Sequence, residues 1–444
     1  MSKLALFGGE KAITKSEKDI FKWPIITKED ENAVLDVLRK GAMSGTDITK
    51  KFENEFATWI GLDKALGFST GTAAIQCAMY GCKVGIGDEI ICPTVTYWAS
   101  GLQAFTLGAT IVFANVDKKT LCIDPKDIEH RISEKTKAIV VVHYLGHPCD
   151  MDEIMKIAKK HNVKVIEDVS HAQGALYKGK KVGTFGDVAA MSLMSGKSFA
   201  IGEAGILATN NTEIYDRAIA FGHYSRFNKE TIETKDLEEF IGLPLGGYKY
   251  RMHQMSSAVG RVQLKYYDER SAEIRKAMNY FWDLLEDVPG LIAHRVDEKE
   301  GSNMGGWYAA KGIYDSEALG GLSVTRFCEA MRAEGVDCNP GANLALHTHP
   351  LLQTCDVYGH GKPTRIANAN RDVRLLDESL APSEEIGAMT YSIPWFKKFY
   401  PEIIEEYANA YKKVAMNYKE LLKDDPGNPD EIGGWHFFKH TKKS

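Results

Sequence analysis

Two side chains whose types suit covalent chemistry follow neighbouring apolar segments. Lys197 lies among small residues in Ser195-Gly-Lys-Ser198, just after an apolar run, so its amine is expected to project into a cleft. Asp168 comes at the end of the apolar run that starts at Val163. A lysine amine in a cleft is a nucleophile toward carbonyl groups, and a carboxylate can hold a proton on a basic partner. The pair therefore predicts chemistry on a carbonyl compound.

A turn of small residues supplies a third feature. Ser69-Thr-Gly71-Thr72 precedes a run with helical periodicity that begins near Ile75. Such a turn presents unpaired N–H groups and the positive end of the helix dipole, which suits a phosphate. Tyr97 and its neighbour Trp98 add aromatic rings that could stack on a ligand. A phosphate seat, a carboxylate, an aromatic ring and a cleft lysine are together what pyridoxal phosphate requires.

The elements that must position these residues alternate between strands and helices. Short apolar runs, typical of strands covered on both faces, occur between stretches of helical periodicity. This order favours a mostly parallel, doubly wound α/β sheet with ligands at the carboxyl ends of its strands. The expected strands are residues 89–92, 110–114, 138–143, 163–166, 188–193 and 206–209.

The second half of the chain has a different pattern, with long helical stretches in place of alternating strands and helices. A long helix is expected over residues 253–285, a further one over 324–334, and an amphipathic one over 402–422. We expect three parts, and the last of them to be a smaller α+β domain. They are an N-terminal arm (1–30), a large cofactor-binding domain (31–265) and a small C-terminal domain (266–444).

Composition excludes several classes of protein. The 444 residues carry 55 Lys and Arg against 60 Asp and Glu, a net charge of −5 without long blocks of one sign. That balance disfavours a general nucleic-acid or membrane surface, and no apolar run is long enough to span a bilayer. The eight cysteines form no CxxC pair and resemble buried thiols of a reducing compartment. We therefore expect a cytoplasmic protein.

The run EDVSHAQGALYKGKKVGTFGDVAAMSLMSGKSFAIGEAG resembles the signature of the DegT/DnrJ/StrS-type sugar aminotransferases. Further similarities are SGTDITKKFENEFA, STGTAAIQCA, PTVTYWAS, HYLGHPCDMDEI, YKYRMHQMSSAVGRVQL and the later HTHP. The resemblance extends from about Trp23 to Leu422. It implies a fold-type I, aspartate-aminotransferase-like homodimer with active sites shared between subunits, and pyridoxal 5′-phosphate as cofactor.

The resemblance assigns a role to each matching residue. Lys197 corresponds to the Schiff-base lysine and Asp168 to the partner of the pyridine nitrogen, although an Asp after a strand is also a common helix N-cap. His171 corresponds to the residue near the phenolic oxygen of the cofactor. Tyr97 corresponds to the stacking aromatic, with Trp98 as its rival. Gly71, Thr72 and Ser192 correspond to the phosphate site.

Three departures from the family pattern stand out. Lys249 occupies a position where many members have an Asn that reaches the phosphate of the partner subunit, so Lys249 is a candidate for the same contact. Ala204 replaces a glycine of the G-E-G-G turn, which could change how closely that loop approaches the cofactor. The segments 303–321 and 341–363 are longer than expected and fall where substrate loops would lie.

The function implied is an aminotransferase that moves an amino group from L-glutamate or L-glutamine to a keto group of a nucleotide-activated sugar or cyclitol. Lys197 disfavours the dehydratase branch of the family, where a histidine takes its place. The Ser-Gly-Lys197 context also resembles that of the aminohydroxybenzoate synthases and inosose aminotransferases. The alternatives are therefore a dehydratase or aminohydroxybenzoate-synthase-like enzyme, or a non-catalytic pyridoxal-phosphate-binding regulator.

Other candidate residues have weaker patterns. His143, His147 and Cys149 form H-x3-H-x-C, but no fourth ligand has a suitable spacing, so we expect no metal site. His347 and His349 lie in a segment that lines the substrate side in the family. Arg226 and Arg251 could bind a carboxylate or phosphate, or form structural ion pairs. The sequence does not decide the roles of these two histidines and two arginines.

Overall fold

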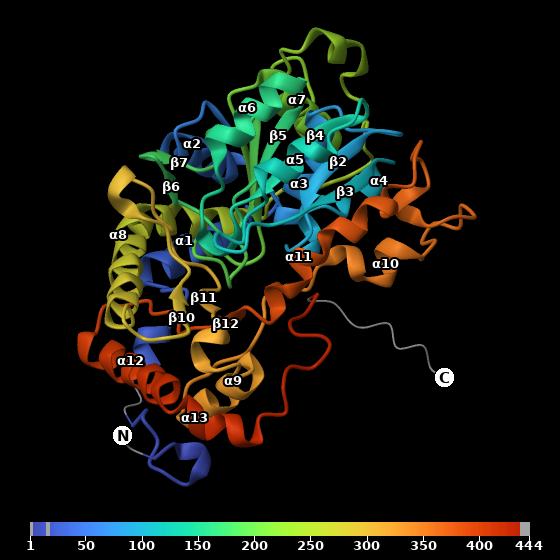
Figure 1. The fold of residues 1–444 in the computed structure, drawn as a ribbon. Helices are drawn as coiled ribbons and strands as arrows, with labels where there is room; N and C mark the ends of the chain where they lie inside the picture. Colours follow the sequence, from blue (N-terminus) through green and yellow to red (C-terminus); the bar gives the residue numbers. More distant parts are fainter. Residues whose placement is uncertain (1–2, 15–17, 436–444) are drawn as a thin grey trace.

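A seven-stranded sheet forms the centre of the molecule in the computed structural model, which describes residues 3–14 and 18–435 (Figure 1). The strand order is β1-β9-β8-β5-β4-β2-β3. Strands β8, β5, β4, β2 and β3 run parallel, whereas β9 is antiparallel to both β8 and β1. The strands are β1 (Lys64–Phe68), β2 (Glu89–Pro93), β3 (Thr110–Ala114), β4 (Thr136–Val142), β5 (Lys164–Asp168), β8 (Val188–Ser192) and β9 (Gly205–Thr209).

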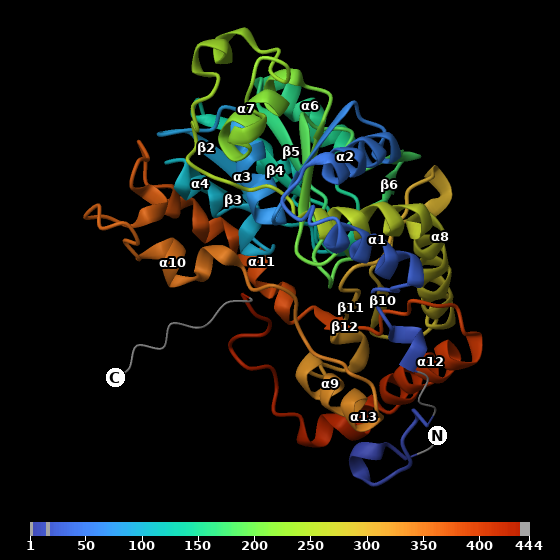
Figure 2. The same ribbon diagram turned by 180° about the vertical axis from the view of Figure 1, so that it is seen from behind.

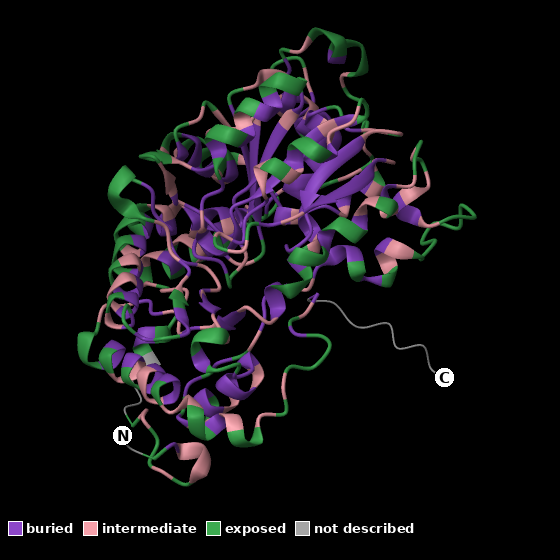
Figure 3. Cartoon of the chain, viewed as in Figure 1, coloured by how far each residue is buried: buried purple, intermediate pink, exposed green. Residues whose placement is uncertain are grey.

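Burial explains why these segments are strands. Nearly every residue of β2, β3, β4 and β9 is buried, because helices cover both faces of the sheet (Figure 3). A sheet covered on both faces needs apolar side chains on both, so the strands lack the alternation of a half-exposed sheet. The predicted α/β class with a mostly parallel sheet is confirmed. The sequence reading missed β1, a short strand at the edge of the sheet.

Helices begin and end at recognisable capping residues. Asp150 accepts a hydrogen bond from Glu153 N at the start of α6, and Asn162 ends it with φ 52°. The expected helix over 402–422 is instead α12 followed by the separate turn α13. The helices are α1 (Lys28–Arg39), α2 (Asp47–Ile60), α3 (Gly71–Gly81), α4 (Gln103–Thr106), α5 (Pro125–Arg131), α6 (Met151–His161), α7 (Thr212–Gly222), α8 (Gln254–Leu284), α9 (Val324–Ala333), α10 (Pro350–Gln353), α11 (Ala381–Glu384), α12 (Pro401–Met416) and α13 (Tyr418–Leu421).

A second layer packs below the large sheet. Its three-stranded antiparallel sheet, β10 (Leu291–Ala293), β11 (Lys311–Tyr314) and β12 (Thr390–Ser392), lies against α8, α9 and α12. A separate hydrophobic core unites these elements with Leu4 and Ile20 near the N-terminus. The long α8 also contacts α1 and α2 beside the large sheet, so it joins the two layers (Figure 2).

The chain crosses between the two cores more than once. Buried residues between Ala342 and Ile386 belong to the core of the large sheet, although they follow β11 in the chain. The division at residues 30 and 265 remains a prediction. In the described part of the chain, no helix is long and apolar enough to cross a membrane.

A close backbone contact joins β9 to the start of α3. A Cβ atom on Gly205, at the start of β9, would lie 2.3 Å from the carbonyl carbon and oxygen of Thr70 and 2.5 Å from Gly71 N. Ala204 is fully buried one residue earlier, so alanine at this position does not separate the two segments. Gly205 is the glycine on which the contact depends.

We expect Gly205→Ala to lower the free energy of unfolding by about 1–3 kcal/mol, because the added methyl group displaces backbone rather than a flexible side chain. Thermal unfolding of the apoprotein measures the effect. Gly85→Ala is the matched control, because its Cβ would meet nothing nearer than Asp88 Oδ2 at 4.0 Å. Equal melting temperatures for the two variants would contradict the prediction.

Candidate active site

A pocket of about 720 Å³ lies where β4, β5 and β8 end. Val142, Asp168 and Ser192, the last residues of these strands, line it. This is the edge at which parallel sheets hold their ligands. Seven of the eight predicted site residues line the same pocket: Lys197, Asp168, His171, Tyr97, Gly71, Thr72 and Ser192.

Lys197 lies in the loop between β8 and β9 and is held by its backbone. Its N–H donates to Met194 O at 2.8 Å, and its carbonyl accepts from Trp23 Nε1 at 2.9 Å. The side chain is buried, with Nζ 4.1 Å from the centre of the Tyr308 ring. Burial lowers the pKa of Lys197 to about 8, against the opposing attraction of Asp168. A substantial fraction of the amine is therefore neutral, and nucleophilic, near neutral pH.

Asp168 is fixed by one hydrogen bond to each carboxylate oxygen. Ser100 Oγ donates to Oδ2 at 2.7 Å, and Ser170 N donates to Oδ1 at 3.0 Å. The Asp168 side chain is buried at the edge of the pocket. Each oxygen keeps lone-pair capacity for another donor, so this carboxylate can accept a proton-bearing nitrogen of a ligand.

Glu167, the residue before Asp168, is buried and holds the end of β5. Its carboxylate accepts from the N–H groups of Gly183, Phe185 and Gly186 at 2.6–2.8 Å, and His143 Nε2 lies 3.0 Å away. Burial opposes ionisation of Glu167, but His143 and these N–H groups hold its pKa below the ordinary value. His143 is thus engaged within the fold rather than in the pocket.

The turn before α3 brings the helix start onto the end of β8. Thr70 Oγ1 accepts from Ala73 N at 3.1 Å and caps the helix. A Cβ atom on Gly71 would lie 2.6 Å from Ser192 Cα, so only glycine permits this approach. Gly71, Thr72 and Ser192 therefore meet at one end of the pocket, as a phosphate site requires.

Aromatic residues line the space between these groups. The His171 ring lies 5.4 Å from Tyr144 and 4.6 Å from Tyr308, centre to centre, and its Nδ1 accepts from Leu145 N at 3.3 Å. Tyr97 lines the pocket and packs against Trp98 at 4.9 Å, whereas Trp98 does not line it. The geometry favours Tyr97 over Trp98 as the ring that meets a ligand.

Several candidates lie elsewhere. Lys249 is exposed and does not line this pocket of its own chain. Arg226 forms a buried ion pair with Glu53 at 2.8 Å, which is a structural role. His347 lies 2.7 Å from Thr94 Oγ1 and 3.1 Å from Glu384, and His349 caps α10. Arg251 lines a separate surface cavity with Arg226.

Sequence reasoning missed the pocket residues that come from the second half of the chain. Tyr308, Lys311 and Asn343 line the pocket. They belong to the two unexpectedly long segments, and that length was the signal that could have singled them out. Gly433 and Gly434 also line the pocket, and no motif pointed to them.

These two glycines belong to a segment that returns from α13 toward α11 (Figure 1). Gly434 N donates to Ala342 O at 3.3 Å, and Gly434 O accepts from Leu344 N at 3.2 Å. Trp435 is buried against His349, with ring centres 4.5 Å apart. The segment is therefore held against the pocket wall by these two backbone hydrogen bonds and by the buried ring of Trp435.

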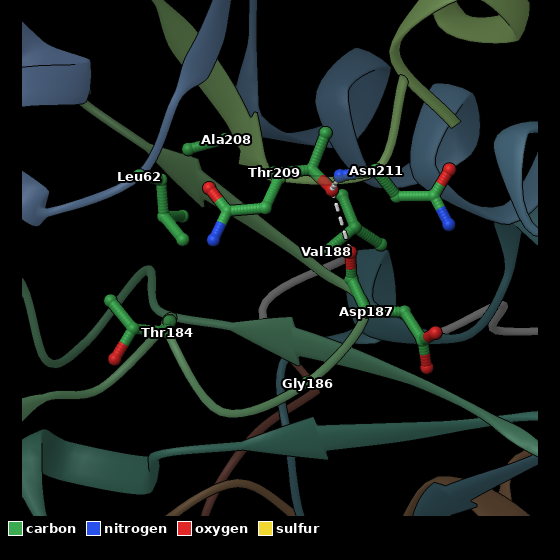
Figure 4. A pocket seen from close by; sticks show the side chains of 10 residues that line it. Leu62, Thr184, Gly186, Asp187, Val188, Ala208, Thr209 and Asn211 are labelled. Carbon is green, nitrogen blue, oxygen red and sulfur yellow. Dashed lines mark hydrogen bonds between the residues drawn. The ribbon is translucent and has the colours of Figure 1, made fainter. Parts of the chain in front are cut away.

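A smaller cavity lies at the opposite edge of the large sheet (Figure 4). Its volume is about 320 Å³, and Asp187 and Thr209 line it. Asp187 is already engaged, because Lys164 Nζ and Val165 N donate to its carboxylate at 2.6 and 2.9 Å. The cavity at the carboxyl ends of the strands is the better candidate site.

The donor set of the larger pocket fits pyridoxal 5′-phosphate. Lys197 would bind the aldehyde carbon covalently, Asp168 would hold the proton of the ring nitrogen, and the turn at Gly71 with Ser192 would hold the phosphate. The cofactor supplies an electron-accepting ring, which the protein side chains cannot provide.

The lowered pKa of Lys197 predicts how apoprotein takes up pyridoxal phosphate. Only the neutral amine attacks the aldehyde, so the uptake rate should rise about tenfold from pH 7 to pH 9, with a midpoint near 8. Absorbance after rapid mixing measures the rate. Lys197→Ala should retain no cofactor after borohydride treatment. A midpoint near 10.5, or borohydride-stable label in that variant, would contradict the assignment.

Trp435→Ala should release the C-terminal segment from the pocket wall. Loss of a buried tryptophan side chain weakens the attachment of the segment by about 3–5 kcal/mol, which is more than the two hydrogen bonds contribute. We expect faster hydrogen exchange at the amides of Gly434 and Leu344, with the melting temperature of the remainder nearly unchanged. Tyr358→Ala, an exposed aromatic, is the control. Unchanged exchange at both amides would show that Trp435 does not hold the segment.

The model of the DegT/DnrJ/EryC1/StrS aminotransferase family matches residues 24–374. GDP-perosamine synthase of Escherichia coli O157:H7 is 37% identical over 278 residues, covering 62% of this chain and 73% of that protein. L-glutamine:scyllo-inosose aminotransferase of Streptomyces griseus is 28% identical over 446 residues, covering 95% and 100%. The structure of the aminotransferase from Psychrobacter cryohalolentis superposes with a TM-score of 0.75 at 27% identity, covering 90% and 99%. The match over most of the chain shows that this protein belongs to the DegT/DnrJ/EryC1/StrS aminotransferase family.

Proposed function

We propose that the protein is a pyridoxal-phosphate-dependent aminotransferase that moves an amino group from L-glutamate or L-glutamine to a keto group of a nucleotide-activated sugar or a cyclitol. The observation that carries this proposal is the buried amine of Lys197 in the same pocket as the hydrogen-bonded carboxylate of Asp168. An amine with a pKa of about 8 can bind a carbonyl compound and can also carry protons near neutral pH.

Each side chain has a defined task in this reaction. When bound, pyridoxal phosphate supplies the carbonyl group that receives the amino group and the ring that takes up electron density. Lys197 Nζ removes the proton from Cα of the amino donor. In the second half of the reaction, it delivers a proton to the former ketone carbon of the acceptor. The Asp168 carboxylate keeps the ring nitrogen protonated throughout, and Ser100 and Ser170 hold it in place.

The relatives support both classes of acceptor. GDP-perosamine synthase is named for a nucleotide-linked amino sugar, and the Streptomyces griseus relative for a cyclitol ketone and an L-glutamine donor. The second relative aligns along 95% of this chain and along its own full length. The alternatives of dehydration and of a non-catalytic regulator are outcomes of the test below.

We also propose a homodimer with shared sites. Lys249 is exposed on its own chain and pairs through the backbone with His223, so its amine is accessible to a second subunit. A lysine at this position suits the phosphate of a cofactor bound by the partner. This role rests on the family pattern of the surrounding Tyr-Lys-Tyr-Arg segment.

The visible absorption spectrum of the holoenzyme tests the function. We expect L-glutamate or L-glutamine to convert the cofactor to its amino form with loss of the long-wavelength band, and a keto-sugar or scyllo-inosose to restore it. Asp168→Ala is expected to slow both conversions by at least 100-fold, because the ring loses its protonated nitrogen. A wild-type band that no amino donor changes would favour the dehydratase or the regulator.

A further inference from the structure

Lys311 is a second lysine of the active-site pocket, and it is half-buried. It is the first residue of β11, in the small sheet, whereas the turn at Gly71 belongs to the large-sheet layer. Lys311 and Lys197 are the two lysines that line the pocket. Burial lowers the pKa of Lys311, against the weaker attraction of Cys338, Cys328 and Asp337.

No carboxylate neutralises Lys311 in the part of the chain that the structure describes, since no ion pair or hydrogen bond involves its Nζ. The exposed lysines of this chain often pair with acidic residues, for example Lys178 with Asp152 and Lys160 with Glu129. A half-buried lysine without such a partner loses part of its hydration on folding and gains no ion pair in return, whereas an anionic ligand in the pocket could supply one.

Asn343 provides an independent observation on the same pocket. Its side chain is 8% exposed and lines the pocket. Its Oδ1 accepts from the Tyr144 hydroxyl at 2.5 Å, but its buried Nδ2 has no acceptor among the described residues. A buried N–H donor without an acceptor costs free energy that an anionic ligand could recover. Lys311 and Asn343 thus both supply unmatched positive character to one pocket.

Of the other charged side chains that line the pocket, Lys197 and Asp168 already have tasks in the proposed reaction, and Glu203 is an exposed carboxylate that would repel an anion. Lys197 and Asp168 serve the cofactor, and the turn at Gly71 with Ser192 serves its phosphate. Of the two proposed acceptor classes, a cyclitol carries no charge, and a nucleotide-activated sugar carries its charge on the diphosphate rather than on the sugar ring that reacts. Both proposed donors, however, carry a carboxylate on the carbon from which Lys197 removes a proton, so this carboxylate must lie in the same pocket.

We propose that Lys311, with Asn343 as a second hydrogen-bond donor, binds the α-carboxylate of the amino donor. This inference rests on the proposed function and adds the residue that selects an amino acid over a simple amine. Lys311 makes a charge-assisted hydrogen bond to the carboxylate, and that bond fixes the donor so that its Cα–H faces Lys197.

The test measures binding of donor analogues that cannot react. Glutaramate and glutarate are the carbon skeletons of L-glutamine and L-glutamate without the amino group, and glutaramide is their uncharged counterpart. Isothermal titration of the holoenzyme should show at least tenfold weaker binding of glutaramate or glutarate to Lys311→Met than to wild type. Glutaramide binding should change less than twofold. Lys311→Arg should restore part of the affinity, and Lys126→Met, an exposed lysine, should behave as wild type.

Three results would overturn the inference. The first is equal affinity of the two acids for wild type and for Lys311→Met. The second is a loss of affinity in Lys311→Met that is as large for glutaramide as for the acids, and the third is no binding of either acid to wild type. The proposed function is judged separately by the absorbance change that L-glutamate or L-glutamine causes in wild type. If that change occurs in Lys311→Met at the same donor concentration as in wild type, the proposed function stands and the proposed role of Lys311 fails. If no donor changes the wild-type spectrum, the function itself fails.

Discussion

The rest of the active site depends on how the end of β5 is held. Glu167 is a fully buried carboxylate that accepts three backbone N–H groups of the loop before β8 and lies 3.0 Å from His143 at the end of β4. These contacts connect β4, β5 and the loop that leads into β8. Removal of the Glu167 carboxylate would leave buried N–H donors without an acceptor, at a cost of roughly 1–3 kcal/mol for each donor, so the arrangement is strongly specified. Because side chains alternate along a strand, fixing Glu167 into the fold turns Asp168 toward the pocket.

The same edge of the sheet is completed by two close approaches that only glycine allows. Gly71 places the start of α3 against Ser192, and Gly205 places β9 against Thr70. The helix start, the end of β8 and the loop that carries Lys197 are therefore positioned relative to one another by backbone contact. Backbone contacts of this kind leave little freedom, which suits a reaction in which an amine must reach carbon atoms with fixed geometry.

The opposite side of the pocket comes from segments that are distant in sequence. Tyr308 and Lys311 precede or begin β11, Asn343 belongs to a segment that packs on the large core, and Gly433 and Gly434 come from the C-terminal return. The side of the pocket that we propose for the cofactor is thus built on the rigid sheet, and the remaining side on loops and the small sheet. Loops on a rigid scaffold are where members of one fold differ in substrate, so this side is where specificity of the protein is expected to reside.

The sequence alone determined the α/β class, six of the seven strands of the large sheet and the set of residues around Lys197 and Asp168. These features are local: apolar runs, capping residues and short motifs are read within a few residues. It did not reveal β1, the separation of α12 from α13, or the pocket residues Tyr308, Lys311, Asn343, Gly433 and Gly434. Only the tertiary structure decided which of the candidate residues meet. It placed Arg226 in an ion pair with Glu53 and His347 in hydrogen bonds with Thr94 and Glu384. It also placed His349 at the start of α10 and left Lys249 outside the pocket of its own chain. The physical reason is that the burial, the pKa and the hydrogen-bond or ion-pair partners of a side chain depend on segments that can be hundreds of residues away. No periodicity within one segment encodes them.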